Sequence, residues 1–428
     1  MKPSVVQLPY GDDSLSVAIP EHNLLDIIYP KSVGEDGSSI TPDNIPDEDR
    51  VIQHALEYPI GVLPLRNIVH PGQRIAIVTS DITRPCPSAK LIPYILEELD
   101  AAGIAVPQDV FIVIALGLHR LMTTQEIEQA IPPEIRRHVS ALNHDSTDTI
   151  HLGYTSRGTP AEFFRPVVEA DVRICLGNLE FHWFAGYSGG AKAILPGCAS
   201  QATINANHAL MVHSGVGSGR IQGNPIREDM EEAVALLGVD FILNVAVDRA
   251  HRIVGAVAGD VIAAHRRGCE MVDLRGRVAL PCKADVVVAS AGGYPKDINL
   301  YQAHKGMEHA SYFLRDGGVL VFLAECREGM GNKIFESWML SASSPAEILE
   351  RIRREFAIGG HKAAGIARIQ QRVRIHLVSD LPDDLVRRLF MLPFKSPQEA
   401  LQSALTQLSS ESRVLVLPQS GSIIPAIG

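Results

Sequence analysis

Short apolar runs alternate with segments of helical spacing along most of the chain. Each run stands between glycine, proline or polar residues, the pattern expected of buried parallel strands. The expected strands are residues 75–78, 110–116, 172–176, 241–247, 284–289, 318–323, 373–378 and 414–417. The expected helices are residues 88–99, a segment from 226, and residues 260–272, 345–354 and 397–408.

Local signals mark where several elements begin. Ser88 is a plausible N-cap, and Thr123 with Glu126 has the character of a capping box. Residues 1–50 alternate short apolar pieces with turns, and the part from Val33 to Arg50 is rich in Asp, Gly, Ser and Pro. We therefore expect an entry hairpin followed by an exposed connection.

Strands that alternate with helices predict an α/β fold of doubly wound, mostly parallel sheets. At 428 residues the chain exceeds the size at which one core keeps growing, so we expect two α/β domains. Residues 1–277 would form a cofactor-binding, catalytic domain, and residues 278–428 a second domain that closes a cleft over it. Because ligands of such sheets bind outside the carboxyl ends of the strands, we expect the active site in that interdomain cleft.

Composition narrows the range of partners. Hydrophobic residues make up 46% of the chain, and the formal net charge is −10 with a pI near 5.9. This charge argues against nucleic acid or an anionic membrane as the main partner, although a local basic pocket for a small anion is compatible with it. No stretch approaches ~18 apolar residues, and Met1–Leu25 has no uninterrupted apolar core, so neither export nor membrane spanning is expected.

The cysteines indicate the compartment. They lie far apart and form no C-x-x-C pair, which favours buried thiols in a reducing compartment over a zinc site or a disulfide framework. We therefore expect a cytoplasmic protein. The six residues are Cys86, Cys175, Cys198, Cys269, Cys282 and Cys326.

The stretch from Gly177 to His208 is the leading candidate for chemistry. It follows an expected strand and contains His182, the pair Gly189-Gly190, and Lys192. Glycine lets backbone N–H groups approach an anion, and a lysine adds charge or a covalent anchor. The P-loop pattern is absent, because its first glycine is missing and Ala193 replaces the metal-binding hydroxyl. An ordinary nucleotide triphosphatase is therefore not expected.

His208 has no carboxylate or cysteine cluster beside it, so a metal centre made only of protein ligands is not supported. A metal that a cofactor brings in, completed by one imidazole, fits better.

Polar residues also follow the other expected strands. Asp81 and Arg84 follow residues 75–78, and the two readings are a salt-bridged turn fixed by Pro85 or a grip on a carboxylate or phosphate. His119 and His182 each come just past a strand, where an imidazole can act as general acid or base near neutral pH. A third group lies at the expected start of a helix. These residues either bind an anion there or belong to a capped helix whose lysine is solvated. Its members are Tyr301, Gln302 and Lys305.

Five of these blocks, in this order, resemble the nickel-dependent lactate racemase family. They are Asp81–Pro85, Gly117–Arg120, His182–Lys192, Asn207–His208, and Gly292–Pro295 followed by Tyr301, Gln302 and Lys305. The resemblance runs from about Leu8 to the C-terminal strand. It implies a nickel-pincer nucleotide tethered to Lys192, with His208 as the remaining nickel ligand.

The resemblance also implies residue roles and a reaction. His119 and His182 would be the acid/base catalysts, while Asp81, Arg84, Gly189, Gly190, Tyr301, Gln302 and Lys305 would line the cofactor and substrate pocket. One histidine would take the proton of a substrate hydroxyl while the Cα hydrogen leaves as hydride, giving a flat 2-keto acid that can take hydride back on its other face. Partners would be a small 2-hydroxy acid and the proteins that build the cofactor and insert nickel.

Departures from the lactate enzyme's pattern leave the substrate open. Ala191 stands where a basic residue is expected, Leu118 and Trp183 adjoin the histidines, and His361 falls where an aromatic residue is expected. Lactate and a larger or more polar 2-hydroxy acid, including an epimerisable sugar acid, are both candidates.

Two other classes of function are weighed against the racemase. A non-catalytic carrier or sensor of the nucleotide would keep Lys192 and His208 but would not need two opposed histidines. A dehydrogenase with diffusible NAD would need a clean G-x-G-x-x-G after an early strand, and the sequence has none.

Overall fold

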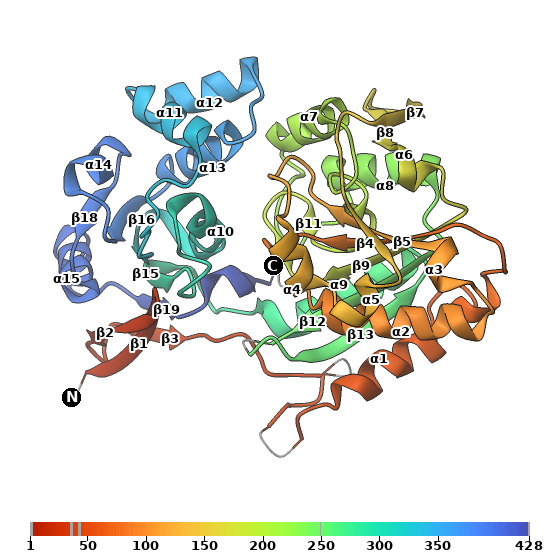
Figure 1. Ribbon diagram of the computed structural model, residues 1–428. Coiled ribbons are helices and arrows are strands. Elements are labelled where there is room, and N and C mark those ends of the chain that lie inside the picture. Colours follow the sequence, from red (N-terminus) through yellow and green to blue (C-terminus); the bar gives the residue numbers. More distant parts are fainter. Residues whose placement is uncertain (1–2, 35–36, 42–43, 85, 249, 427–428) are drawn as a thin grey trace. The chain divides into compact units, whose positions relative to one another are not determined.

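A computed structural model describes residues 3–34, 37–41, 44–84, 86–248 and 250–426. The chain divides into two compact units (Figure 1). One unit comprises residues 32–275, and the other combines residues 1–31 with residues 276–428. Each unit is built on its own six-stranded sheet. The expected α/β fold with mostly parallel sheets is therefore confirmed.

The sheet of the unit 32–275 has the strand order β13-β12-β9-β4-β5-β6. All neighbours are parallel except β12 and β13, which run antiparallel at one edge. The strands are β4 (Ile75–Ser80), β5 (Val110–Ala115), β6 (Ser140–Asn143), β9 (Val172–Asn178), β12 (Phe241–Val247) and β13 (Ile253–Gly259).

Two helices cover one face of this sheet. Alternate strand residues such as Ile75 and Ile77 point into one apolar cluster with Ile52 of α1 (Glu48–Glu57) and Ile95 of α2 (Ser88–Ala101). Burial of each such side chain contributes about 1.5–3 kcal/mol. The remaining main helices of the unit are α4 (Thr124–Ala130), α7 (Gln201–Ala209), α8 (Pro225–Leu237) and α9 (Ala263–Gly276).

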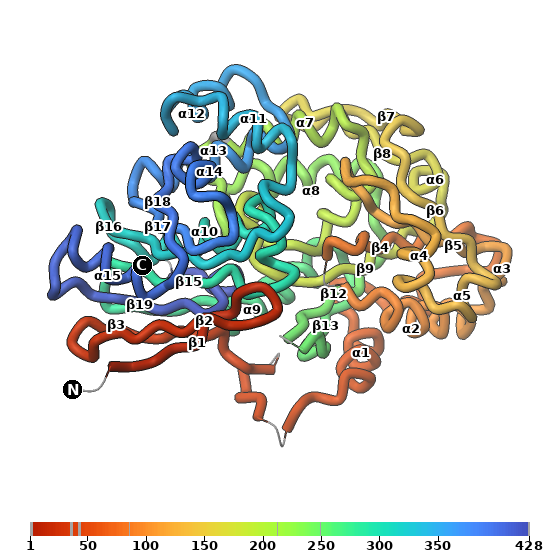
Figure 2. The backbone as a smooth tube through the Cα atoms, turned by 60° about the vertical axis from the view of Figure 1, so that its left-hand side comes forward, coloured from red at the N-terminus to blue at the C-terminus, as the bar shows by residue number. Residues whose placement is uncertain are grey.

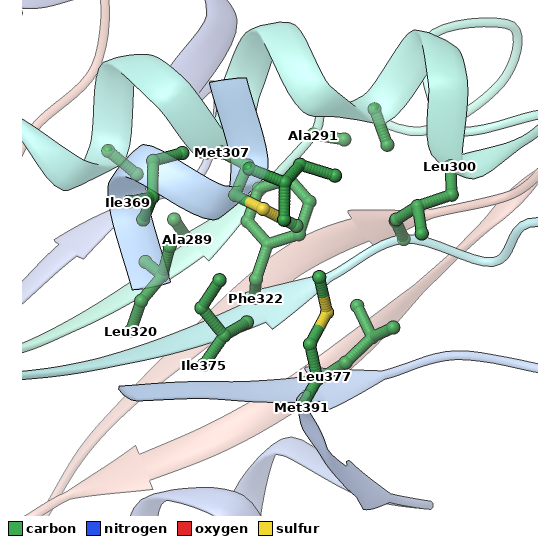
Figure 3. Close-up of a cluster of buried hydrophobic side chains, with 14 of the residues drawn as sticks. Ala289, Ala291, Leu300, Met307, Leu320, Phe322, Ile369, Ile375, Leu377 and Met391 are labelled. Atoms are coloured by element: carbon green, nitrogen blue, oxygen red, sulfur yellow. The ribbon is translucent and has the colours of Figure 1, made fainter. Parts of the chain in front are cut away.

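The sheet of the second unit is wholly parallel, in the order β18-β17-β16-β15-β19-β3. Its strands are β3 (Leu24–Ile27), β15 (Ala284–Ser290), β16 (Leu314–Leu323), β17 (Arg374–Val378), β18 (Leu392–Phe394) and β19 (Val414–Leu417). Figure 3 shows the core on one face, where Met307 of α10 (Leu300–Ser311) and Ile369 of α13 (Gly360–Gln370) lie over Phe322 of β16.

An N-terminal hairpin packs on the opposite face of that sheet. It consists of β1 (Ser4–Tyr10) and β2 (Asp13–Ile19), paired antiparallel. Leu8 and Val17 share an apolar cluster with Val288 of β15 and with Leu401 of α15 (Pro397–Gln407). The strand that follows the hairpin, β3, pairs with β19, so two segments far apart in the sequence lie side by side (Figure 2).

This arrangement corrects part of the expected domain division. The sequence assigned residues 1–277 to the first domain, but residues 1–31 belong to the unit of residues 276–428. The physical reason is the edge of the second sheet, where Leu24 is the register partner of Val414. Strand pairing between distant segments carries no signal in local periodicity.

Most expected elements occur close to their expected bounds, and the entry hairpin and the capping box of Thr123 with Glu126 are confirmed. Ser88 is not an N-cap. It is the first residue of α2, Pro87 takes the cap position, and the Ser88 hydroxyl lies 2.6 Å from that of Thr79. The edge strand β13 was not predicted, because two of its seven residues are glycine.

Two further expectations are tested by the fold. All six cysteines lie within the described residues and are free thiols, four of them buried. In the part of the chain that the structure describes, no helix has the length and apolar character needed to cross a membrane.

Candidate active site

Asp81 and His119 form a close pair at the carboxyl ends of neighbouring strands. Ser80 of β4 is the register partner of Ala115 of β5, so the loops that follow them meet. The Nδ1 atom of His119 lies 2.6 Å from Oδ2 of Asp81. The Asp81 side chain is 5% exposed and that of His119 is 49% exposed, so a buried carboxylate orients a solvent-facing imidazole.

The charge state of Asp81 determines which ring nitrogen of His119 carries the proton. Burial works to raise the pKa of Asp81, but the His119 hydrogen bond and charge, helped by the Thr83 hydroxyl at 2.6 Å and by Arg84, bring it below its ordinary value. An ionised carboxylate only accepts hydrogen bonds, so Nδ1 of His119 must donate. In the neutral ring, Nε2 then carries the lone pair and can accept a proton.

His182 is the last residue of β10 (Phe181–His182), directly before the tight turn that leads to β11 (Gly186–Tyr187). Its Nδ1 accepts the backbone N–H of Ala185 at 3.3 Å, so the proton of the neutral ring is on Nε2. The Phe184 ring meets His182 edge-on at 4.4 Å between centroids and His208 at 4.8 Å. One phenylalanine therefore contacts both of these buried histidines.

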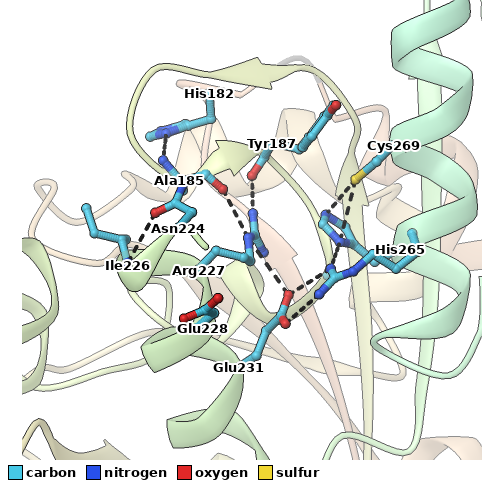
Figure 4. Close-up of polar contacts among 12 residues, drawn as sticks. His182, Ala185, Tyr187, Asn224, Ile226, Arg227, Glu228, Glu231, His265 and Cys269 are labelled. Carbon is cyan, nitrogen blue, oxygen red and sulfur yellow. Dashed lines mark hydrogen bonds and ion pairs between the residues drawn. The ribbon is translucent and has the colours of Figure 1, made fainter. Parts of the chain in front are cut away.

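Buried side chains hold the carbonyl groups of this turn (Figure 4). Arg227 of α8, fully buried, donates through Nε to the Ala185 carbonyl at 3.0 Å and through Nη2 to that of Tyr187. His265 of α9 donates through Nε2 to the Ser188 carbonyl at 2.9 Å. The backbone of the turn is thus set by two neighbouring helices.

Gly189 and Gly190 allow this loop to pack closely on the protein. Both have positive φ, 77° and 57°. A Cβ at Gly189 would lie 2.5 Å from Oδ1 of Asn244, and one at Gly190 would lie 2.7 Å from the ring of His265. The Gly190 N–H also donates to Oδ1 of Asn244 at 2.7 Å. The structure thus explains both glycines by contact with β12 and α9, and their contact with a cofactor stays a prediction.

Lys192 and His208 belong to the same unit as this loop. Lys192 is half-buried in a short 3₁₀ turn (Gly190–Ala193), and His208 is buried near the end of α7. Burial, together with the charge of Lys192, lowers the pKa of His208 to about 3. His208 is therefore a neutral imidazole, the form that binds a metal.

The loop that carries His119 is tied to the same region. The Gly117 N–H donates to the carbonyl of Gly197, five positions past Lys192, at 2.9 Å. Within the described residues, no group of three or more His, Cys, Asp or Glu side chains is placed to hold a metal ion.

Comparison with known proteins decides the family. The model of the lactate racemase N-terminal domain matches residues 10–219, and that of the lactate racemase C-terminal domain matches residues 280–425. The chain is 35% identical to a lactate racemase from Thermoanaerobacterium thermosaccharolyticum, with 98% of each chain covered. It is 31% identical to a lactate racemase from Lactiplantibacillus plantarum, covering 98% of this chain and 99% of the relative.

The chain belongs to the lactate racemase family. Membership makes it a racemase, an enzyme of the isomerase class. The fold agrees: the lactate racemase apoprotein structure from T. thermosaccharolyticum matches with a TM-score of 0.91 at 34% identity, over 99% of this chain and 100% of that one. The family resemblance read from the sequence is thereby confirmed.

Three further expected site residues lie in the other unit of this racemase. Tyr301, Gln302 and Lys305 are on the first two turns of α10, whose N-cap Asn299 accepts the Gln302 N–H. The ammonium of Lys362 lies 3.8 Å from the centroid of the Tyr301 ring and donates to the Tyr301 carbonyl at 2.5 Å. Nothing in the sequence had singled out Lys362, which stands beside His361 on α13.

Arg84, in the unit of residues 32–275, is half-buried, and its charge acts on Asp81. Pro85, which was expected to fix that turn, lies outside the described residues. Both expected roles of Arg84, a structural ion pair and a ligand contact, stay predictions.

Sequence reading missed the residues that support the loop. Arg227 lies in the helix expected from residue 226, and the sequence does not single it out because an arginine among Glu228, Glu231 and Glu232 is an ordinary surface pattern. His265 and Asn244 lie in expected elements but follow no motif. Their role depends on contacts across the fold, which residue type and spacing do not encode.

Replacing Arg227 by Met should destabilise the unit of residues 32–275 by about 2–4 kcal/mol, because two buried carbonyls lose their donor. The measurement is urea unfolding followed by Trp183 fluorescence in a Trp338→Phe background. Arg157→Met is the matched control, since Arg157 makes a partly exposed ion pair with Glu228 on the same helix. Equal losses in the two variants would contradict the proposed support of the loop.

His144 should make the racemase sensitive to acid. It is 2% exposed, and burial lowers its pKa to about 4, below its ordinary 6.5. As the pH falls below 6.5, the unfolded chain takes up a proton that the folded chain refuses, so stability falls. At pH 5 this amounts to about 2 kcal/mol.

The test compares the free energy of unfolding of wild type and His144→Asn at pH 7 and pH 5. The variant should lose less stability on acidification. Phe164→Leu is the control, because Phe164 packs on the His144 ring but does not titrate. An unchanged pH dependence in His144→Asn would refute the assignment.

Proposed function

We propose that this protein racemises or epimerises a 2-hydroxy acid, either lactate or a larger or more polar relative. The observation that carries the proposal is the hydrogen bond of 2.6 Å between Asp81 and Nδ1 of His119. It leaves Nε2 of a half-exposed imidazole able to take a hydroxyl proton. The names of the relatives, both lactate racemases, support the reaction class and make lactate the first substrate to test.

We propose a nickel-pincer nucleotide as the cofactor, tethered through Lys192 and completed by His208. The chemistry of these two residues fits such a group: His208 is neutral and buried, and the charge of Lys192 is close enough to act on it. Imidazole is a suitable ligand for nickel. When bound, the cofactor supplies a hydride acceptor for the Cα hydrogen of the substrate. Proteins that build the cofactor and insert nickel would be partners.

His119 begins proton transfer in this proposal. Nε2 accepts the proton of the substrate hydroxyl, and the ring becomes an imidazolium while Nδ1–H still donates to Asp81. The buried carboxylate stabilises that positive charge and keeps the ring oriented. When the 2-keto acid is reduced again, Nε2 returns a proton to the oxygen.

His182 would serve the other enantiomer, and its hydrogen bond sets a condition. The Ala185 N–H holds Nδ1 as an acceptor, so the ring presents Nε2–H. To accept a substrate proton at Nε2, the ring must first carry its hydrogen on Nδ1, and the Ala185 contact must be released. Because Ala185 is buried, releasing this 3.3 Å contact costs about 1–3 kcal/mol unless another acceptor takes the N–H.

The remaining assignments concern how the ligand is held. We propose that Arg84 and Lys305 grip carboxylate or phosphate groups through charge-assisted hydrogen bonds. Tyr301 and Gln302 would contact the cofactor or substrate. Beside the histidines, Leu118 is half-buried and Trp183 is buried against Phe184 at 4.9 Å between ring centroids. Both side chains are candidates for selecting the substituent on the hydroxy acid.

A non-catalytic carrier or sensor of the nucleotide is the second candidate. It would need Lys192 and His208 alone. The orientation of His119 by a buried carboxylate favours the enzyme, because a carrier has no use for a fixed imidazole tautomer. Turnover of single-enantiomer 2-hydroxy acids by cofactor-loaded protein separates the two.

The cofactor assignment predicts a covalent adduct on one peptide. In loaded protein, intact-mass and peptide mass spectrometry should find added mass on the peptide that contains Lys192, and Lys192→Ala should carry none. Lys296→Ala, a lysine of the other unit, is the control and should keep the adduct. An adduct that persists in Lys192→Ala would end the tethering proposal.

The proton-transfer assignment predicts a large effect of Asp81→Asn. An amide at this position no longer demands a donor at Nδ1, so the wrong tautomer becomes accessible and kcat should fall by about 10²–10⁴-fold. Asp145→Asn is the control, because Asp145 is an exposed carboxylate that closes a turn with Thr147. The assay is chiral chromatography of a panel of single-enantiomer 2-hydroxy acids. Full activity in Asp81→Asn would remove the pair from the mechanism.

A further inference from the structure

The side-chain amide of Asn207 has a fixed orientation. Its Nδ2 atom lies 2.9 Å from Oδ2 of Asp229 and 3.0 Å from the carbonyl oxygen of Ile226. Both neighbours are acceptors, so the NH₂ group must face them, and a flipped amide would place oxygen against oxygen. Asn207 is fully buried, so water does not offer another partner.

This orientation determines which nitrogen of His208 carries hydrogen. The Oδ1 atom of Asn207 lies 3.3 Å from Nδ1 of His208. The amide oxygen has no hydrogen, so Nδ1 must be the donor in this contact. In the neutral ring the lone pair is then on Nε2.

Asp229 is the first member of this hydrogen-bond relay, which runs from Asp229 through Asn207 to His208. It is a fully buried carboxylate on α8, and three uncharged donors hold it. The Thr155 hydroxyl binds Oδ1 at 2.5 Å, while the Thr159 hydroxyl at 2.8 Å and the Asn207 amide bind Oδ2. Thr155 and Thr159 flank the turn between β7 (Thr149–Tyr154) and β8 (Pro160–Phe164), which fixes the carboxylate from a separate element.

We propose that Asp229 and Asn207 are positioning residues that lock His208 in its Nδ1–H tautomer, so that Nε2 is the nitrogen offered to the nickel of the cofactor. This inference rests on the proposed function for the identity of the metal. Outer partners of this kind commonly orient metal-binding histidines and raise their basicity. Here Asp229 fixes the orientation of the Asn207 amide, and the amide fixes the tautomer of His208. The carboxylate itself does not touch the imidazole.

The tautomer can be measured in the apoprotein, without cofactor or substrate. Long-range ¹H–¹⁵N correlation spectra of protein labelled in histidine distinguish the two neutral tautomers, and His208→Gln identifies the His208 signals. Wild type should show Nδ1–H. A signal pattern of Nε2–H in wild type would overturn the proposal.

Two variants test the relay. Asn207→Leu removes the acceptor, and Asp229→Asn removes the carboxylate that orients Asn207, so both should shift His208 toward the Nε2–H form. Thr155→Val is the matched control: it deletes a bond to the other oxygen of Asp229 and should keep the wild-type tautomer. If Asn207→Leu does not fold, Asp229→Asn and the wild-type spectrum still decide. A wild-type tautomer in a folded Asn207→Leu or Asp229→Asn protein would overturn the relay.

Metal retention is the second readout. Cofactor-loaded Asn207→Leu should bind nickel about 10- to 100-fold more weakly than wild type during dialysis against a chelator, measured as metal per chain. Unchanged retention would overturn the link to the metal. Failure of the racemase assay with the wild-type tautomer intact would instead refute the proposed function, so the two failures are distinguishable.

Discussion

Two buried charges on one helix organise the candidate active site. Arg227 and Asp229 are two positions apart on α8, so they project to different sides of the helix. Arg227 binds the carbonyls of the turn that follows His182, and Asp229 holds the amide next to His208. A buried charge is stable only when polar partners satisfy it, so each side chain constrains the segments that it touches. The helix thereby sets two parts of the site at once.

The charge balance around Arg227 extends this constraint to α9. Glu231 lies 3.9 Å from Nε of Arg227 and accepts two hydrogen bonds from Arg266. Arg266 in turn donates to Nδ1 of His265, whose Nε2–H binds the Ser188 carbonyl. Burial holds the pKa of His265 well below its ordinary value, so the ring stays neutral and keeps one tautomer. Four side chains thus connect into one network behind the glycine-rich loop.

The sequence predicted the parts of the candidate site in which polar residues follow recognisable strands or can be compared with a known motif. Asp81 and His119 follow strands whose apolar runs are plain, so their meeting at one sheet edge could be expected. The failed P-loop match separated Lys192 from ordinary nucleotide binding. The reason for Gly189 and Gly190 could not be read, since the atoms that require them belong to Asn244 and His265, far along the chain. Ser88 is a residue type that often caps helices, but its hydroxyl forms a hydrogen bond with Thr79 instead, because α2 packs on β4.

The pairing of Leu24 with Val414 has a consequence for how the chain reaches its native state. The unit of residues 32–275 is inserted within the sequence of the other unit, and all its strands are present once residue 275 has been synthesised. The other sheet cannot gain its edge strand β3 until β19, which follows the inserted unit in the sequence, has also been synthesised. Contacts between such distant segments form slowly, because a long loop must close first. The apolar face of the N-terminal hairpin therefore stays uncovered while the inserted unit can already fold.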